Sequence, residues 1–266
     1  VGIVRIEGDI EIAGTDGMTG SSVNSDVIIK RLDALQNDSR IKAILLRINS
    51  SGGTVASVQE IFQKLMEIRN KNIPLVASLG DVAASGGYYL AAACNKIYTN
   101  YSTITGSIGV ITMVPNISNL LNKYGIRMDI VKSGALKDIG SMYRNMNARE
   151  RKILQDIINI SYEKFLKDIA KGRNLKISWI RPYADGRVMA GATAVKNKLA
   201  DKIGTFQDAL AAARKMANLA KNSAVYDAQQ HGFQKMFFNM KSFIGSFFLQ
   251  QRHMKQKKIK VYSRMQ

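Results

Sequence analysis

Residues 75–92, LVASLGDVAASGGYYLAA, place a short apolar run before a glycine pair and a second apolar run after it. Leu75–Leu79 has the length and composition of a buried strand. Ser85-Gly86-Gly87 interrupts the run, and the residues from Tyr88 to Ala92 then indicate a helix. The stretch therefore predicts a strand that is followed directly by a helix, with Ser85 at the junction.

The same order of strand, glycine pair and helix occurs one unit earlier. Ile41–Ile48 is an almost continuous apolar run, Ser50-Ser51-Gly52-Gly53 interrupts it, and apolar side chains recur at helical spacing from Val55 to Asn70. A strand at Val1–Ile6 and an amphipathic helix at Asn24–Gln36 are expected before it. This alternation predicts an α/β fold with a parallel sheet and right-handed crossovers. In such sheets, functional groups usually lie where a strand ends and the next helix begins.

The remainder of the chain predicts shorter strands and two long helices. The strands are expected near Lys96–Tyr98, Ile104–Thr112 and Arg127–Val131, and the helices near Asn147–Lys171 and Thr205–Leu219. We divide the chain into an α/β domain, residues 1–220, and a C-terminal extension, residues 221–266.

The C-terminal extension carries an apolar stripe with the period of a helix, followed by a basic tail. The stripe consists of Phe233, Met236, Phe237, Met240, Ile244, Phe247 and Phe248. An apolar helix face of this size has to be covered. We favour a subunit interface, while a bilayer and the protein's own core remain open as alternatives.

Charge is the unusual feature of the composition. The 266 residues include 39 Lys and Arg against 20 Asp and Glu, a net charge of +19 at neutral pH. A protein with this net charge attracts anionic partners, and the two candidates are nucleic acid and anionic lipid. The longest nearly uncharged stretch, Leu79–Cys94, is too short to span a bilayer. Because the chain begins at Val1, we interpret it as a fragment and expect an anchor in the natural protein outside it.

Cysteine and histidine are scarce, which limits the chemistry. Cys94 is the only cysteine; it lies in an apolar run and is interpreted as a small buried hydrophobe. His231 and His253 are the only histidines, and both follow the predicted core. Neither is well placed for a Ser-His-Asp triad, so a serine enzyme would need another base, for which lysine is the natural substitute.

Five short blocks, taken in order, resemble the bacterial signal peptide peptidases of the SppA family. The blocks are NSSGG at 49–53, DVAASGGYY at 81–89, TGSIG at 105–109, SGALKD at 133–138, and GRV at 186–188 with DKIG at 201–204. The likeness covers about residues 1–219. One block alone is weak, but five in order are specific.

The resemblance implies a catalytic role for three side chains. Ser85 would attack the scissile carbonyl, and Lys137 would take its proton and later donate it to the leaving amine. Ser107 matches the serine that orients the lysine. No metal and no cofactor are expected.

The resemblance also implies an oxyanion hole built from backbone N–H groups. Gly86 would supply one donor and Gly52 or Gly53 the other, since glycine allows close approach to the substrate. Ser51 stands where relatives commonly carry proline, so a less rigid loop is expected here.

The family has the fold of the Clp proteases and crotonases. The resemblance to this family implies that the substrates are remnant signal peptides and other unfolded segments. It further implies a membrane anchor, an extracytoplasmic catalytic domain and a ring-like homo-oligomer. The net charge adds an anionic membrane surface as a candidate partner. No nucleic acid partner is expected.

Other interpretations compete with this one. Ser85 could be an ordinary helix N-cap, and Lys137 a solvated lysine among many. At the level of function, a crotonase-like acyl-CoA enzyme would share the fold without a Ser/Lys pair. A basic nucleic-acid-binding module would account for the charge, although no recognition motif is present.

Overall fold

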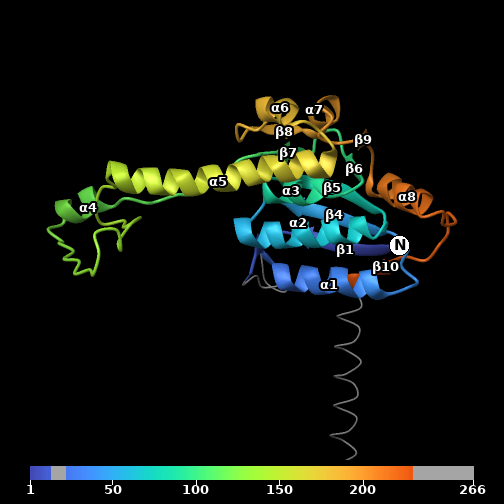
Figure 1. Ribbon diagram of the computed structural model, residues 1–266, viewed down its shortest axis with the longest axis horizontal. Coiled ribbons are helices and arrows are strands. Elements are labelled where there is room, and N and C mark those ends of the chain that lie inside the picture. The colour runs from blue at the N-terminus through green and yellow to red at the C-terminus, as the bar shows by residue number, and fades with distance from the viewer. Residues whose placement is uncertain (13–21, 230–266) are drawn as a thin grey trace, which may run out of the picture.

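The computed structural model describes residues 1–12 and 22–229, and its centre is a mostly parallel β-sheet (Figure 1). Its main path runs in the order β10, β1, β4, β5, β6, β9. These strands are Tyr226–Asp227, Gly2–Glu7, Ile44–Ser50, Leu75–Ala84, Lys96–Thr99 and Lys202–Ile203. β7 (Ile104–Gly106) extends the sheet from the end of β5, and β8 (Val188–Ala190) pairs antiparallel with β7. β2 (Asp9–Glu11) and β3 (Ser22–Asn24) form a small parallel sheet of their own.

The three central strands are buried along most of their length because helices cover both faces of the sheet. β1, β4 and β5 pair in parallel, with Ile3 opposite Leu45 and Leu45 opposite Val76. Neighbouring side chains of one strand point to opposite faces, so Leu45 and Leu46 enter different clusters of the core. This explains the continuous apolar runs of the sequence.

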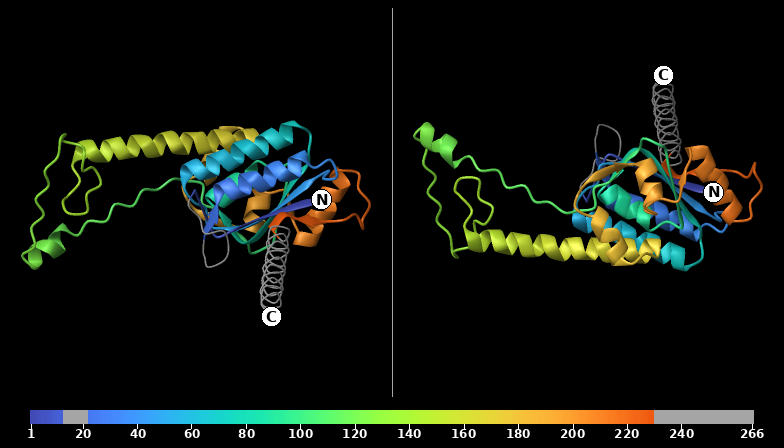
Figure 2. Two further views of the ribbon diagram at one scale, coloured as in Figure 1. Left: turned by 90° about the horizontal axis from the view of Figure 1, so that it is seen from below. Right: turned by 90° about the horizontal axis from the view of Figure 1, so that it is seen from above.

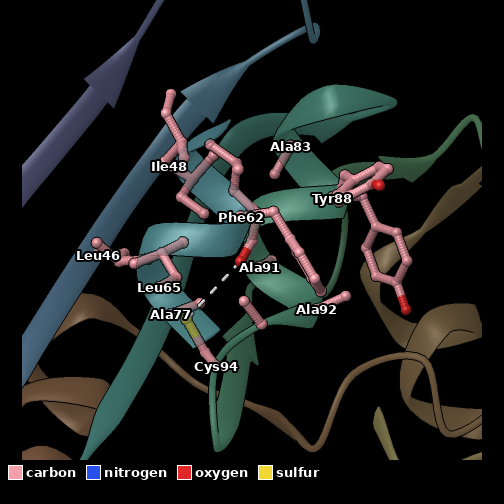
Figure 3. Close-up of a cluster of buried hydrophobic side chains, with 14 of the residues drawn as sticks. Leu46, Ile48, Phe62, Leu65, Ala77, Ala83, Tyr88, Ala91, Ala92 and Cys94 are labelled. Atoms are coloured by element: carbon pink, nitrogen blue, oxygen red, sulfur yellow. Dashed lines mark hydrogen bonds between the residues drawn. The ribbon is translucent and has the colours of Figure 1, made fainter. Parts of the chain in front are cut away.

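Four helices cover the face that carries Leu46. They are α1 (Ser25–Asn37), α2 (Val55–Asn70), α3 (Gly86–Ala92) and the C-terminal half of α5 (Ala148–Arg173). Figure 3 shows Phe62 and Leu65 of α2 beside Ala91 and Ala92 of α3 in this layer. Cys94 lies in the same cluster, fully buried, and burial raises the pKa of its thiol to about 12. The prediction that Cys94 is a buried hydrophobe is confirmed.

One helix covers the opposite face. α8 (Phe206–Met216) packs Ala209, Leu210 and Ala213 against Val1, Ile3, Leu45 and Val76. It begins with a capping box, in which the side chain of Thr205 accepts a hydrogen bond from the N–H of Asp208. Three short elements, α6 (Ile177–Ile180), η1 (Arg181–Tyr183) and α7 (Gly191–Lys196), lie between α5 and β9 in the chain.

An arm projects from the sheet (Figures 1 and 2). We define it as residues 110–147 together with the N-terminal half of α5. An extended segment leads outward to α4 (Ser118–Lys123), and α5 returns along the other side. Apolar side chains of the arm face solvent, including Met113 at 84% exposure and Val131 at 100%.

The predicted sheet and helices are confirmed with two exceptions. The expected strand at Arg127–Val131 is wrong, since this segment lies in the arm, where none of the strands that the structure describes pairs with it. The strand expected over Ile104–Thr112 ends at Gly106, whose φ of +79° turns the chain away. Met128, Ile130 and Val131 of the first segment are exposed, whereas Ile108 of the second is fully buried in the core without strand pairing.

The region after residue 220 is described only in part. β10 pairs in parallel with β1, so residues 226–227 belong to the sheet of the α/β domain. The predicted apolar helix from Phe233 to Phe248 and the basic tail lie outside the described residues. Across residues 1–12 and 22–229, no helix is both long and apolar enough to cross a bilayer.

Candidate active site

Ser85 occupies a sharp turn between β5 and α3. Its backbone has φ +50° and ψ −118°, a conformation that costs a non-glycine residue about 1–3 kcal/mol. The turn is fixed on both sides, because the N–H of Ser85 donates to the carbonyl of Gly106 at 2.9 Å and its carbonyl accepts from the N–H of Tyr89 at 2.9 Å. In α/β-hydrolases, strained strand-to-helix turns of this kind present a serine side chain outward.

The side chain of Ser85 does not cap the helix. Although Ser85 precedes α3, it makes no side-chain hydrogen bond to the first turn. An N-cap residue has extended backbone angles, which Ser85 lacks. The capping interpretation therefore does not explain this serine, and its hydroxyl stays available.

A glycine loop lies against this turn. A Cβ atom at Gly86 would lie 3.2 Å from both the Cα of Gly52 and the N of Gly53. Gly52 has φ +126°, and its N–H donates to Oγ of Ser50 at 3.1 Å. The N–H of Gly86 stands in the first turn of α3, where no intrahelical carbonyl is available to it.

β2 holds the glycine loop from the outside. The N–H of Ile10 donates to the carbonyl of Gly52 at 2.8 Å, and the carbonyl of Ile10 accepts from the N–H of Thr54 at 2.9 Å. Ser51 Oγ also donates to Oδ1 of Asp9 at 2.5 Å. These bonds hold the loop without a proline at position 51, and the expectation of a less rigid loop stays a prediction.

A pocket of about 300 Å³ opens beside Ser85. Its walls come from the glycine loop, α2, α3, α5 and the segment after β7. The lining residues are Ser51, Gly53, Val55, Val58, Ser85, Gly86, Tyr89, Ser107, Gly109, Val110, Ile111, Ser161, Phe165 and Gly186. The lining includes the apolar side chains of Val55, Val58, Val110, Ile111 and Phe165, which suits an apolar substrate side chain.

Most of the residues predicted for catalysis meet at this pocket. Ser85, Ser107, Gly53 and Gly86 line it, and a Cβ atom at Gly52 would lie 3.2 Å from Oγ of Ser85. Ser107 has φ +50°, and its N–H donates to the carbonyl of Arg187 at 2.8 Å. β7 and β8 thus hold Ser107 at the pocket wall.

Lys137 is the exception. It does not line the pocket and is exposed in the arm. The segment from residue 117 to 147 lies beside the far end of α5, away from the sheet (Figures 1 and 2). Glu150 in the first turn of α5 precedes Phe165 of the pocket by 15 residues, about 22 Å along a helix axis. A general base must come within about 3 Å of its proton, so Lys137 does not reach Ser85 of its own chain in this arrangement.

Sequence reasoning missed one wall of the pocket. Phe165 stacks on Tyr89 with ring centroids 4.3 Å apart, and Phe62 meets Tyr89 edge-on at 5.0 Å. The hydroxyl of Tyr89 donates to the buried carboxylate of Asp168, which also pairs with Lys164. Burial, with the bond to Asp168, holds the pKa of Tyr89 far above its ordinary value. The helical spacing of Ser161, Phe165 and Asp168 could have indicated a shared face, but not which helix it covers.

The fold and the site together define a serine peptidase of the Clp protease type. The Clp protease family matches residues 17–104, and peptidase family S49 matches residues 67–220. The chain belongs to peptidase family S49.

Named relatives agree with this assignment. A Synechocystis sp. protein named as a protease is 41% identical over 200 residues, 75% of this chain and 72% of that protein. An Enterococcus faecium protein named as an SppA signal peptide peptidase is 36% identical over 219 residues, 82% of this chain and 64% of that protein. The chloroplastic serine protease SPPA of Arabidopsis thaliana is 30% identical over 227 residues. That match covers 85% of this chain but only 33% of the Arabidopsis protein.

Proposed function

We propose that the chain is a serine endopeptidase in which Ser85 is the nucleophile and Lys137 of a neighbouring copy is the general base. The observation that carries the proposal is the turn at Ser85. A strained serine, free of any capping bond, opens into an apolar pocket beside two glycine N–H groups. That arrangement suits attack on a carbonyl and stabilisation of the resulting oxyanion.

The oxyanion donors are the N–H groups of Gly86 and Gly53. Gly53 is preferred to Gly52, because the N–H of Gly52 is already donated to Ser50. Gly53 lines the pocket, and the hydrogen bonds between Ile10 and the loop use Gly52 and Thr54 instead of its N–H. Ser107, at the same pocket, orients the amine of the lysine when the site is complete.

A neighbouring copy is invoked because one chain does not complete the site. The residue after Lys137, Asp138, is joined through Arg144 to the first turn of α5, and Phe165 at the pocket lies 15 residues further along that helix. The arm that carries it exposes apolar side chains on several turns, among them Met113, Val131 and Ile160. Exposed apolar surface of this extent marks a protein contact. Docking the arm on the next copy would cover it and bring Lys137 to that copy's Ser85, which generates a ring if the rotation closes.

The substrates are apolar peptides, and remnant signal peptides are the class we favour. The pocket is lined by Val55, Val58, Ile111 and Phe165, which accept an apolar side chain. The relative from Enterococcus faecium is named for activity on signal peptides. The net charge of +19 favours an enzyme that works at an anionic membrane surface, with an anchor outside this chain and the catalytic domain on the extracytoplasmic side.

A serine-reactive acylating probe tests the central assignment. The parent chain should be labelled on the peptide that contains Ser85, and Ser85→Ala should not be labelled. Ser102→Ala, which removes an exposed serine outside the pocket, is the matched control and should be labelled like the parent. Equal labelling of Ser85→Ala, or modification of another serine, would contradict the assignment.

A further inference from the structure

A single arginine holds the segment that carries Lys137. Nε of Arg144 donates to Oδ2 of Asp138 at 2.8 Å, and Nη2 donates to Oδ1 at 2.8 Å. Asp138 is the residue directly after Lys137. Nζ of Lys132 adds a bond of 2.5 Å to the same carboxylate and one of 3.1 Å to the carbonyl of Ala135. The loop before and after Lys137 is therefore tied to one carboxylate.

The other edge of the same guanidinium binds α5. Nη1 of Arg144 donates to Oε2 of Glu150 at 2.9 Å, and Nη2 donates to Oε1 at 2.5 Å. Glu150 is fully buried and belongs to the capping box that begins the helix. Its carboxylate accepts from the N–H of Asn147 at 3.0 Å, and its own N–H donates to the side chain of Asn147 at 2.9 Å. Arg144 thus joins the Lys137 loop to the first turn of α5.

The charges of this cluster are fixed over the working range of an enzyme. The guanidinium of Arg144, with Lys132, holds the pKa of Asp138 well below its ordinary value. Arg144, with the backbone of Asn147, lowers the pKa of Glu150 to about 2. An arginine stays charged and offers two carboxylates a planar, bidentate fork, which a lysine does not.

α5 extends from this cluster to the pocket. Its distal turns place Ser161 and Phe165 in the wall beside Ser85. Further along, Gly172 packs so closely on Ala92 of α3 that a Cβ atom there would lie 2.2 Å from the Ala92 carbonyl oxygen. The helix is thus anchored on α3, which begins directly after Ser85, and its first turn is anchored on Arg144.

We infer that Arg144 is the positioning residue of the catalytic lysine. By clamping Asp138 to the capped end of α5, it fixes where Lys137 stands on the arm, and hence where the amine arrives at the serine of the next copy. The inference rests on the proposed function of Lys137. Arg144 itself touches neither substrate nor the reacting atoms.

The test compares Arg144→Ala with Lys152→Ala in the full chain, by peptide hydrolysis. Lys152 forms an exposed ion pair with Asp156 on the same end of α5 and serves as the control. Arg144→Ala should lower kcat by on the order of 10²-fold, the cost of a small misplacement of a catalytic group. KM should change little because the pocket is intact. Lys152→Ala should keep both parameters.

Guanidinium ion separates positioning from a merely structural role. Added at millimolar concentration, it can occupy the space left by the arginine fork and should restore part of the kcat of Arg144→Ala. It should not restore Lys137→Ala, which lacks the base. A folded Arg144→Ala enzyme with parental kcat would overturn the inference, and so would a kcat loss that guanidinium leaves unchanged.

Asp138→Asn decides the question if Arg144→Ala does not fold. This variant keeps the Arg144–Glu150 pair and the helix cap but weakens the hydrogen bonds between Arg144 and the loop that carries Lys137. We expect a smaller loss of kcat in the same direction, with a smaller decrease of the melting temperature than in Arg144→Ala; parental kcat would overturn the inference. Lys137→Ala distinguishes the two proposals. If it is inactive while Arg144→Ala and Asp138→Asn are normal, only the positioning role fails. If Lys137→Ala is active, the lysine assignment fails and the positioning role fails with it.

Discussion

A Cβ atom placed on Gly52 would lie 3.2 Å from Oγ of Ser85, and 2.9 Å from the backbone N of Gly86. Both contacts are tighter than side chains ordinarily tolerate, and φ at Gly52 is +126°. The glycine loop and the serine turn are far apart in the sequence but lie against each other at the proposed reaction centre. The absence of a side chain at Gly52 allows this close approach.

Gly52→Ala should therefore disable the enzyme by displacing the oxyanion donors. We expect kcat to fall by about 10²–10³-fold, the effect of losing one such donor. Gly125→Ala is the matched control, since Gly125 also has positive φ, +68°, but nothing within 4 Å of a Cβ atom. It should share the backbone strain and keep the rate. Steady-state kinetics on both variants, with melting temperatures, measures the difference; parental kcat in Gly52→Ala would contradict the proposed geometry.

Ser107→Ala should reduce turnover more than binding. The hydroxyl is proposed to orient the lysine amine, an interaction that matters in the transition state, so kcat should fall while KM changes little. The loss should be smaller than that of Ser85→Ala. Ser102→Ala, which removes an exposed hydroxyl outside both the pocket and the arm, provides the comparison. Equal kcat in Ser107→Ala and the parent would reduce Ser107 to a turn residue.

Tyr89→Phe should destabilise the wall of the pocket. The buried carboxylate of Asp168 would lose the hydroxyl of Tyr89 and keep Lys164. Leaving a buried acceptor without one of its partners lowers the free energy of unfolding by about 1–3 kcal/mol. For a domain of this size, each kcal/mol lowers Tm by roughly 2–4 °C. Tyr101→Phe, at a tyrosine that is 71% exposed, should leave Tm unchanged. Thermal unfolding of both variants tests this, and an unshifted Tm in Tyr89→Phe would show that the bond carries no net stability.

The anchoring of the arm should be lost only in acid. The pKa of Glu150 is lowered to about 2 and that of Asp138 is also lowered, chiefly by Arg144. A carboxyl group whose pKa is lowered by folding stabilises the fold at pH values above its unfolded pKa, near 4.5. That contribution is lost as the pH falls towards 2. Tm should therefore hold between neutrality and about pH 5 and decline below it. In Glu150→Gln this acid decline should be shallower, starting from a lower Tm at neutral pH. An identical slope in both proteins would exclude Glu150 as a source of the acid sensitivity.

The sequence predicted the parts of this molecule that depend on local pattern. The buried strands at 44–50 and 75–84, the helices that follow them and the glycine pairs at their junctions were all visible as runs and interruptions of apolar residues. Arg127–Val131 was misread because alternation indicates a strand only if a partner strand exists, and the partner is a tertiary fact.

The residues of the candidate site were likewise predictable from the sequence only in part. Ser85, Ser107 and the glycine loop could be named from short blocks, and the structure brings them to one pocket. The location of Lys137 could not be predicted, because it depends on the course of a 26-residue helix and a projecting arm. Nor could Tyr89, Phe165 and Asp168 be assigned to the wall, since their contact joins two helices with no sequence signal for pairing.

A mixing experiment tests whether two copies share each site. Ser85→Ala lacks the proposed nucleophile and Lys137→Ala the proposed base, so each variant alone should be inactive. If the lysine comes from the neighbouring copy, a refolded equimolar mixture should regain activity. Random assembly then gives about one site in four with both groups intact. If the pair forms within one chain, no site in the mixture is complete.

Two controls make that result interpretable. Mixing Ser85→Ala with a chain that carries both substitutions supplies no complete site and should stay inactive. Mixing the parent with the double variant measures how freely copies exchange. Recovered activity in the Ser85→Ala and Lys137→Ala mixture supports the shared site, since the arm that carries Lys137 lies away from its own pocket. No recovery, together with proven exchange, would show that the arm folds back to serve its own Ser85.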